Sequence, residues 1–335
     1  METKSNRNNI KFLILIMIPI LSFFLSITLG RYSISVKEVF RILIAEIMGK
    51  DIGVPEVVET VIFQIRIPRI IVAMIVGSSL SVSGAVYQGM FKNPMVSPDI
   101  LGTSAGAGFG AALGILLSYS TLGIQLLSFG FGLLAVFLTY SISTKIGRND
   151  SIIFVLILAG ILVGTIFQSF ISLAKYVADP YDKWLMGSLA NISIRDVYVI
   201  IVSFILGMIP LLLIRWHLNT LSFGEEEAKA LGIDTTKLRL IVIICSTFLT
   251  ASSVSVAGMI GWVGLIVPHI ARMIVGPDFK VLLPASALIG STYLLFVDNI
   301  ARTVATIELP LGILTSLIGA PFFIYLLFKT RKGWH

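Results

Sequence analysis

Long apolar runs recur along the whole chain and dominate what it can fold into. Ten can be drawn, at approximately residues 11–30, 63–90, 98–118, 122–144, 151–174, 196–216, 237–257, 259–275, 281–304 and 309–328. A bilayer core of about 30 Å is crossed by about 20 apolar residues in a helix. Because lipid offers no hydrogen-bond partners, the backbone of a spanning run must satisfy itself as a helix. The runs therefore predict an all-α polytopic membrane protein.

Composition favours the same class. Of the 335 residues, 56% are hydrophobic and 13% are charged, whereas soluble domains are about a quarter charged. The sequence lacks the alternating segments of about ten residues that are typical of an outer-membrane barrel. We therefore interpret residues 1–335 as one transmembrane domain with about ten helices. Two more polar stretches, 35–50 and 175–195, are expected to be partly buried connections.

The placement of lysine and arginine predicts the orientation. With the N-terminus inside, the inner segments hold 15 of the 25 basic and 8 of the 18 acidic residues, so the net charge of +7 lies on one side. This asymmetry indicates a multi-pass protein of the cytoplasmic (inner) membrane with both termini in the cytoplasm, and it gives no reason to expect a nucleic-acid partner. The first apolar run is long and lacks a convincing cleavage site, so we expect a retained span rather than a signal peptide.

An internal echo suggests two related halves. Residues 78–84 and 252–258 agree at five of seven positions, and the predicted spans that carry them run in opposite directions. Inverted repeats of this kind are common in transporters, because two symmetry-related halves provide two access states. Residues 63–174 and 237–328 are the candidate repeats. Small residues are frequent in membrane helices, so chance agreement remains an alternative.

Motifs for enzyme chemistry are missing from the sequence. The chain has no phosphate-binding loop and no His-Glu-x-x-His pair, and its three histidines are scattered. Cys245 is the only cysteine, which excludes an internal disulfide and a cysteine metal cluster. We expect no catalytic residue, no metal site and no cofactor in this chain. If ATP drives the protein, ATP and Mg must bind a partner chain.

Two loops and one charged group stand out. Residues 84–107 contain Asn93-Pro94, which favours a turn between two helices. Residues 217–236 form a polar inner loop, in which an acidic first turn and Gly232 predict a short helix over 225–232. At the outer end, Arg66, Arg69 and Arg302 would provide three cations, either for carboxylates of an external protein or for lipid phosphates. Arg302 also follows Asp298 by four residues, which predicts a local ion pair.

These features resemble the FecCD, or type II, permease family of ATP-binding cassette importers for iron–siderophores, haem and vitamin B12. The resemblance covers nearly the whole chain. It rests on these residues, in family order: Arg66-Ile67-Pro68-Arg69, 84–88, Asn93-Pro94, Leu101-Gly102, Leu231-Gly232, 261–264, Val267-Pro268-His269, Arg272, Leu283-Pro284, Asp298, Ala301-Arg302, 308–312 and 319–322.

The resemblance implies a vitamin B12 importer permease-like subunit of ten helices that pairs into a homodimer with a central pathway. Arg66, Arg69 and Arg302 would receive acidic residues of an external substrate-binding protein. Two ATPase subunits would dock inside on a coupling helix containing Glu225, Glu226, Ala228, Leu231 and Gly232. The inner gate would contain Asn93, Pro94, Met95, Ile153 and Phe154, although the family often has small hydroxyl residues near the last two positions.

The expected function is import of a metal chelate through an apolar pathway, with an iron–siderophore as the favoured cargo. Haem, cobalamin and molybdate or tungstate remain alternatives, because nothing in the spans distinguishes them. A secondary transporter would need a coupling-ion site, and the sequence shows no pair of intramembrane acids.

Overall fold

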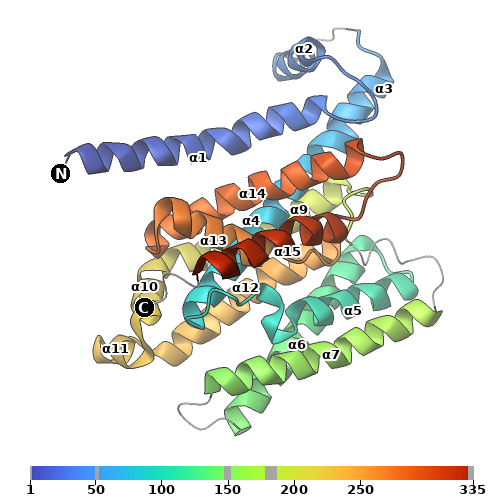
Figure 1. The fold of residues 1–335 in the computed structure, drawn as a ribbon. Coiled ribbons are helices and arrows are strands. Elements are labelled where there is room, and N and C mark those ends of the chain that lie inside the picture. Colours follow the sequence, from blue (N-terminus) through green and yellow to red (C-terminus); the bar gives the residue numbers. More distant parts are fainter. Residues whose placement is uncertain (1, 50–52, 147–151, 178–186, 331–335) are drawn as a thin grey trace.

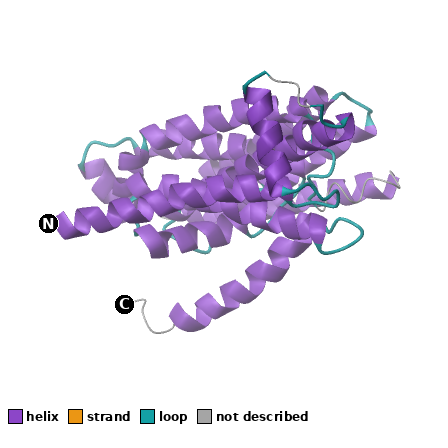
Figure 2. Cartoon of the chain, turned by 90° about the horizontal axis from the view of Figure 1, so that it is seen from above, coloured by secondary structure: helices purple, strands orange, loops and turns teal. Residues whose placement is uncertain are grey.

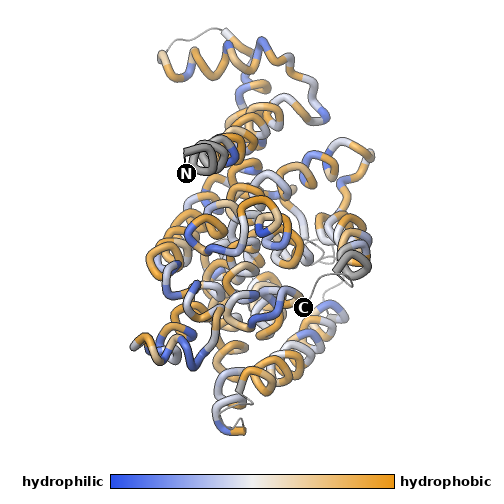
Figure 3. The backbone as a smooth tube through the Cα atoms, turned by 60° about the vertical axis from the view of Figure 1, so that its left-hand side comes forward, coloured by the Kyte–Doolittle hydropathy of each residue, from blue (hydrophilic) through white to orange (hydrophobic). Residues whose placement is uncertain are grey.

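The computed structural model describes residues 2–49, 53–146, 152–177 and 187–330, and within these ranges the chain is helical and without strands (Figures 1 and 2). Seven described helices are long and apolar enough to cross a membrane, and three shorter apolar helices accompany them. Hydrophobic residues dominate these helices along their length (Figure 3). The ten correspond one for one to the ten predicted runs, which confirms the fold class.

The described ranges consist mainly of helices joined by short connections. Their bounds are α1 Glu2–Thr28, α2 Val36–Ile47, α3 Glu56–Glu59, the π-helical η1 Thr60–Arg66, α4 Ile67–Met90, the 3-10 turn η2 Pro98–Leu101, α5 Thr103–Leu116, α6 Thr121–Ile146, α7 Ile152–Val177, α9 Ile194–Leu213, α10 Arg215–Phe223, α11 Glu225–Ala230, α12 Thr235–Ala257, α13 Val263–Val275, α14 Phe279–Thr303 and α15 Leu311–Thr330. The non-spanning helix expected over 35–50 is α2. Part of the connection expected over 175–195 lies outside the described residues.

Two predicted spans are shorter than expected. The run 98–118 begins with η2 and becomes α-helical only at Thr103, because Gly102 adopts a left-handed conformation with φ of +76°. The run 259–275 becomes helical only at Val263, after Gly258 and Trp262, which both have φ of +71°. Positive φ values interrupt a right-handed helix. At Trp262 the positive φ could not be predicted from the sequence, since such values are rare outside glycine.

Helices α4 and α12 form the centre of the molecule. Of the most apolar 18 residues, 83% are buried in the segment that ends with α4 and 78% in α12, compared with 22% in α1. Lys92, just after α4, donates from Nζ to the Phe223 carbonyl at 2.6 Å, and Glu225 pairs with Arg239 in α12. The end of α4 therefore lies beside the start of α12, which confirms that the echoed segments run in opposite directions. The inverted repeat itself stays a prediction.

The ends of the bundle are distinct. The first turns of α1 and the last turns of α15 lie at the same end as α10 and α11, which we call the α11 end, and α2 and α3 lie at the opposite, α2 end (Figure 1). Viewed from above, α15 stands away from the other helices (Figure 2). Its exposed side chains include Ile313, Leu317 and Ile324. An apolar surface of this kind is suited to lipid or to another membrane protein.

Glycines allow the central helices to touch through their backbones. A Cβ on Gly84 of α4 would lie 1.8 Å from the Gly264 carbonyl oxygen in α13, and one on Gly77 would lie 2.1 Å from that of Gly290 in α14. Small residues are the usual means of close packing in membranes, where lipid is as apolar as the side chains. The positions of α13 and α14 on α4 thus depend on two residues without side chains.

We predict that Gly84→Ala lowers the stability of the fold by about 1–3 kcal/mol or more, because the added methyl group overpacks a backbone contact. Thermal unfolding of the purified protein in detergent would measure the change. Gly130→Ala is the matched control: no atom lies within 4 Å of its added Cβ. Equal unfolding temperatures for both variants would contradict the tight α4–α13 crossing.

Candidate functional site

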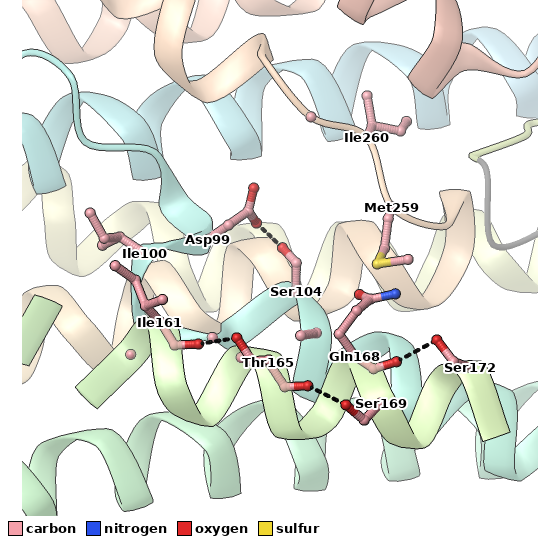
Figure 4. Close-up of a pocket in the computed structure, with 15 residues that line it drawn as sticks. Asp99, Ile100, Ser104, Ile161, Thr165, Gln168, Ser169, Ser172, Met259 and Ile260 are labelled. Carbon is pink, nitrogen blue, oxygen red and sulfur yellow. Dashed lines mark hydrogen bonds between the residues drawn. The ribbon is translucent and has the colours of Figure 1, made fainter. Parts of the chain in front are cut away.

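A cavity of about 510 Å³ lies where α7 passes η2 and the start of α5. One wall is a single face of α7, formed by Gly160, Ile161, Gly164, Thr165, Gln168, Ser169 and Ser172. The remaining walls are formed by Asp99, Ile100, Gly102, Ser104 and Ala105 and by Met259, Ile260 and Gly261 (Figure 4). The spacing on α7 follows helical periodicity, so its polar residues share one face.

The exposed surface of α7 is divided in two. Thr165, Gln168, Ser169 and Ser172 are exposed on the cavity side. Large apolar side chains are exposed elsewhere on the helix, among them Phe154, Leu158, Leu162, Ile166 and Phe170. Polar side chains in a membrane helix usually face a cavity or a protein partner, since lipid cannot hydrogen-bond them. This cavity therefore has both polar and apolar walls, and the apolar pathway stays a prediction.

The arginines at the α2 end are not free cations. Arg66, Arg69 and Arg302 are 4%, 6% and 5% exposed. Arg69 binds Asp298 of α14, with Nη2 2.9 Å and Nε 3.0 Å from Oδ1, and binds Glu308 through Nη1 and Nη2, each at 3.0 Å. Two carboxylates thus fill its guanidinium fork. The predicted pair of Asp298 and Arg302 is present, with 3.6 Å between Oδ2 and Nε.

Arg66 and Arg302 instead hold the end of α1. Arg66 donates from Nη1 to the carbonyl of Ile27 at 2.6 Å, and Arg302 donates to those of Ser26 at 2.7 Å and Leu29 at 2.8 Å. The last carbonyls of a helix lack intrahelical partners, and cations there also suit the helix dipole. The three cations expected at this end are thus buried and bonded within the chain. Capture of an external protein by these residues stays a prediction.

Pro68 lies between Arg66 and Arg69, at the start of α4. Proline has no N–H and cannot continue regular helical bonding. The seven residues before Ile67 form the π-helix η1, whose wider turn changes the direction in which side chains leave the helix. Arg66 and Arg69 are both buried, and their separation by three residues places them on one face of the helix.

At the α11 end, the short helix ends as predicted. Gly232 has φ of +77°, and the backbone N–H of Ile233 donates to the Ala228 carbonyl at 3.0 Å. Left-handed glycine is a common helix terminator. Ala228 is fully buried, whereas Glu226, Leu231 and Gly232 are exposed. Leu231 is 66% exposed in a polar loop, which leaves an apolar group available for a partner.

Glu225 faces the protein itself. Its carboxylate binds Arg239 of α12 at 2.8 Å and Lys229 at 3.2 Å, and Thr235 donates to it at 3.2 Å. Partial burial alone would raise the pKa of Glu225, but the positive charges of Arg239 and Lys229 and the hydrogen bonds outweigh it and lower the pKa. Glu225 therefore fastens α11 to α12 rather than offering a free charge.

The predicted gate residues occupy two separate segments. Asn93 accepts at Oδ1 from the Met95 N–H at 2.9 Å, which fixes the turn after α4, and Pro94 lies within it. Met95 is 47% exposed. Ile153 and Phe154 lie in the first turn of α7; Ile153 packs against the core, and Phe154 is 69% exposed. A gating role for these residues stays a prediction.

Comparison with known proteins identifies the family. The model of the FecCD transport family matches residues 16–329. The chain belongs to the FecCD transport family. FecCD proteins are membrane transport components of ATP-binding cassette systems, with the ATPase activity on a separate subunit. They work with ATPase and substrate-binding partners. The chain is thus a permease of the cell membrane, not an enzyme.

Relatives within the FecCD family carry different cargo names. The chain is 42% identical over 317 residues to the molybdate import system permease protein MolB of Haemophilus influenzae, covering 92% of both. It is 43% identical over 280 residues to the cobalamin import system permease protein BtuC of Halobacterium salinarum (82% and 75%). It is 38% identical over 276 residues to a protein of Helicobacter pylori named a probable iron chelatin transport system permease (81% and 83%).

A solved structure has the same FecCD fold. It is described as an inward-facing conformation of a transporter of the metal-chelate ABC type, and it is 39% identical to this chain. The TM-score is 0.84, and the match covers 96% of this chain and 99% of the other. The ten-helix architecture is therefore shared with a metal-chelate type transporter.

We predict that Arg69→Met destabilises this FecCD protein by about 3–5 kcal/mol, because it leaves the fully buried Asp298 without its main partner. The double variant Arg69→Met/Asp298→Leu should recover part of that loss. Thermal unfolding in detergent would measure both. Arg31→Met, at an exposed position of the α2 end, is the control. A single variant as stable as the control would show that the ion pair contributes nothing.

A second prediction concerns Glu225. Glu225→Gln should increase amide hydrogen exchange over residues 225–232, because a neutral side chain binds Arg239 and Lys229 less strongly. Glu227→Gln, an exposed neighbour, should not. Since the pKa of Glu225 is lowered in the fold, its contribution is present above the unfolded value and is lost as pH falls, below about pH 4. Unchanged exchange in Glu225→Gln would contradict the fastening role.

Proposed function

We propose that the chain is the membrane subunit of an importer that moves a metal chelate, preferably an iron–siderophore, across the cytoplasmic membrane. The observation that carries this proposal is the α7 cavity. Its volume of about 510 Å³ is far larger than a bare ion needs and is typical of sites for small molecules. The relatives named for an iron chelatin and for cobalamin support a chelate, and the molybdate relative leaves an oxyanion as the alternative.

The arrangement of surfaces supports pairing with a second copy. The polar face of α7 is open in the single chain, and its exposed hydroxyl and amide groups are poorly suited to lipid. A second permease facing this side would enclose the cavity and form a central pathway. We propose that a homodimer forms in this way. Helix α7 and helix α15, which stands away from the other helices, would lie near the contact. The gate assignment of Met95 and Phe154 belongs to the same proposal, because both are exposed at the α11 end of the helices.

We further propose that the α11 end faces the cytoplasm and receives the two ATPase subunits. The exposed side chains of Glu226 and Leu231 would contact the ATPase, whereas Ala228 and Glu225 would hold α11 in place. The positive-inside distribution of charge supports this orientation. The external substrate-binding protein would then dock at the α2 end. Its acidic residues would compete with Glu308, which is only partly buried, for the fork of Arg69.

Uptake measurements test the function. Cells without their own iron-chelate permease, expressing this chain with its ATPase and binding protein, should accumulate radioactive iron from a ferric trihydroxamate only when ATP is available. Leu231→Asp should lower uptake about tenfold or more, since loss of an interface anchor costs about 2 kcal/mol. Leu231→Ile, which keeps an apolar side chain at the same exposed position, is the control.

Three outcomes would revise the proposal. Uptake that persists without the ATPase subunit would indicate a secondary transporter. Uptake of cobalamin, haem or molybdate in place of the iron chelate would keep the importer and change its cargo. Normal uptake by Leu231→Asp would remove that residue from the ATPase contact.

A further inference from the structure

Each of the three hydroxyl groups on the cavity face of α7 donates a hydrogen bond to the carbonyl group four residues earlier in the helix. Thr165 donates to the Ile161 carbonyl at 2.8 Å, Ser169 to that of Thr165 at 2.9 Å, and Ser172 to that of Gln168 at 3.0 Å (Figure 4). A hydroxyl group has one donor and two acceptor lone pairs. With each proton used inside the helix, the three hydroxyls can offer only lone pairs to the cavity.

The facing wall adds a carboxylate. Asp99 lines the cavity and accepts a hydrogen bond from the Ser104 hydroxyl, so that donor is also used (Figure 4). Ser104 is the second residue of α5, and the positive end of a helix dipole would otherwise attract an anion. Asp99 already occupies that end. An ionised carboxylate can only accept hydrogen bonds.

No positively charged side chain in the cavity lining offsets the Asp99 carboxylate. The residues that line the cavity include no lysine, arginine or histidine. The third wall, Met259, Ile260 and Gly261, has no side-chain donor. Among the lining side chains, the Gln168 amide is the one group that retains N–H donors. Apart from this amide, the lining side chains present hydroxyl lone pairs and the Asp99 carboxylate to whatever enters the cavity.

We infer that this cavity selects by charge, with Asp99 as the specificity-determining residue: it favours neutral or cationic chelates that carry N–H or O–H donors, and it disfavours oxyanions. An oxyanion needs donors or cations, and here it would meet mainly side-chain acceptors and, where Asp99 is ionised, a like charge, which is an effective way to reject a ligand. The inference rests on the proposed function, in which this cavity is part of the cargo pathway.

Cysteine reactivity measures the cavity's charge without any transport. In a Cys245→Ala background, Ser169→Cys should react faster with a cationic trimethylammonium methanethiosulfonate than with an anionic sulfonate analogue. After normalisation to a free thiol at pH 8, we expect a preference of roughly tenfold, as for one nearby charge at intermediate dielectric. Asp99→Asn should remove most of it, and Asp99→Lys should reverse it. Ser120→Cys, an exposed serine outside the cavity, should show no effect of Asp99.

An absence of cation preference at Ser169→Cys, or a preference that Asp99→Asn leaves intact, would overturn the inference. If Ser169→Cys does not fold, Ser172→Cys on the same face gives the same test. Uptake then distinguishes the two proposals. Ferric trihydroxamates with a pendant ammonium, acetamide or succinate group differ in charge at similar size, and uptake corrected for binding-protein affinity should fall in that order. Uptake of none of them, with the charge preference present, would contradict the proposed cargo alone.

Discussion

Arg69 and Asp298 face each other between α4 and α14, and the α2 end of the molecule depends on this ion pair. Both side chains are buried, and a buried charge without a partner is among the most costly defects a protein can contain. Glu308, three residues before α15, also binds Arg69. Arg302 contacts Asp298 and donates hydrogen bonds to carbonyl groups at the end of α1. A single charged cluster thus connects helices that are distant in sequence. It lies about two helical turns from the Gly77–Gly290 contact between α4 and α14.

The opposite end has the same kind of organisation. Glu225 joins α11 to α12 through Arg239, and Lys92 joins the end of α4 to the carbonyl before α11. The two most buried helices are therefore both attached to the short helix at which an ATPase is proposed to dock. A displacement of α11 would act on α12 directly and on α4 through the end of α10, and α4 and α12 carry the antiparallel serine-rich segments in the middle of the bundle.

Much of this could be predicted from the sequence, for identifiable reasons. Apolar runs and charge placement depend on local composition, so the ten helices and the end of α11 at Gly232 could be predicted. The partners of the arginines were not, since Arg302 binds carbonyls 273 and 276 residues earlier and backbone acceptors leave no sequence pattern. The polar face of α7 was missed, although the helical spacing of Thr165, Gln168, Ser169 and Ser172 indicates it. The direction in which the hydroxyl groups donate their hydrogen bonds could be found only in the structure. The non-helical stretch before Val263 had no sequence signal beyond Gly258 and Gly261.

The end of α1 also bears on how the chain is assembled during synthesis. Its carbonyl groups can be reached by Arg66 once 39 further residues have emerged, but by Arg302 only after nearly the entire chain has been made. The first helix therefore enters the bilayer with an early, partial anchor and receives its final one from the ninth. A nascent chain that stops before residue 302 would leave α1 loosely held, which gives quality-control proteases a physical criterion for recognising an incomplete permease.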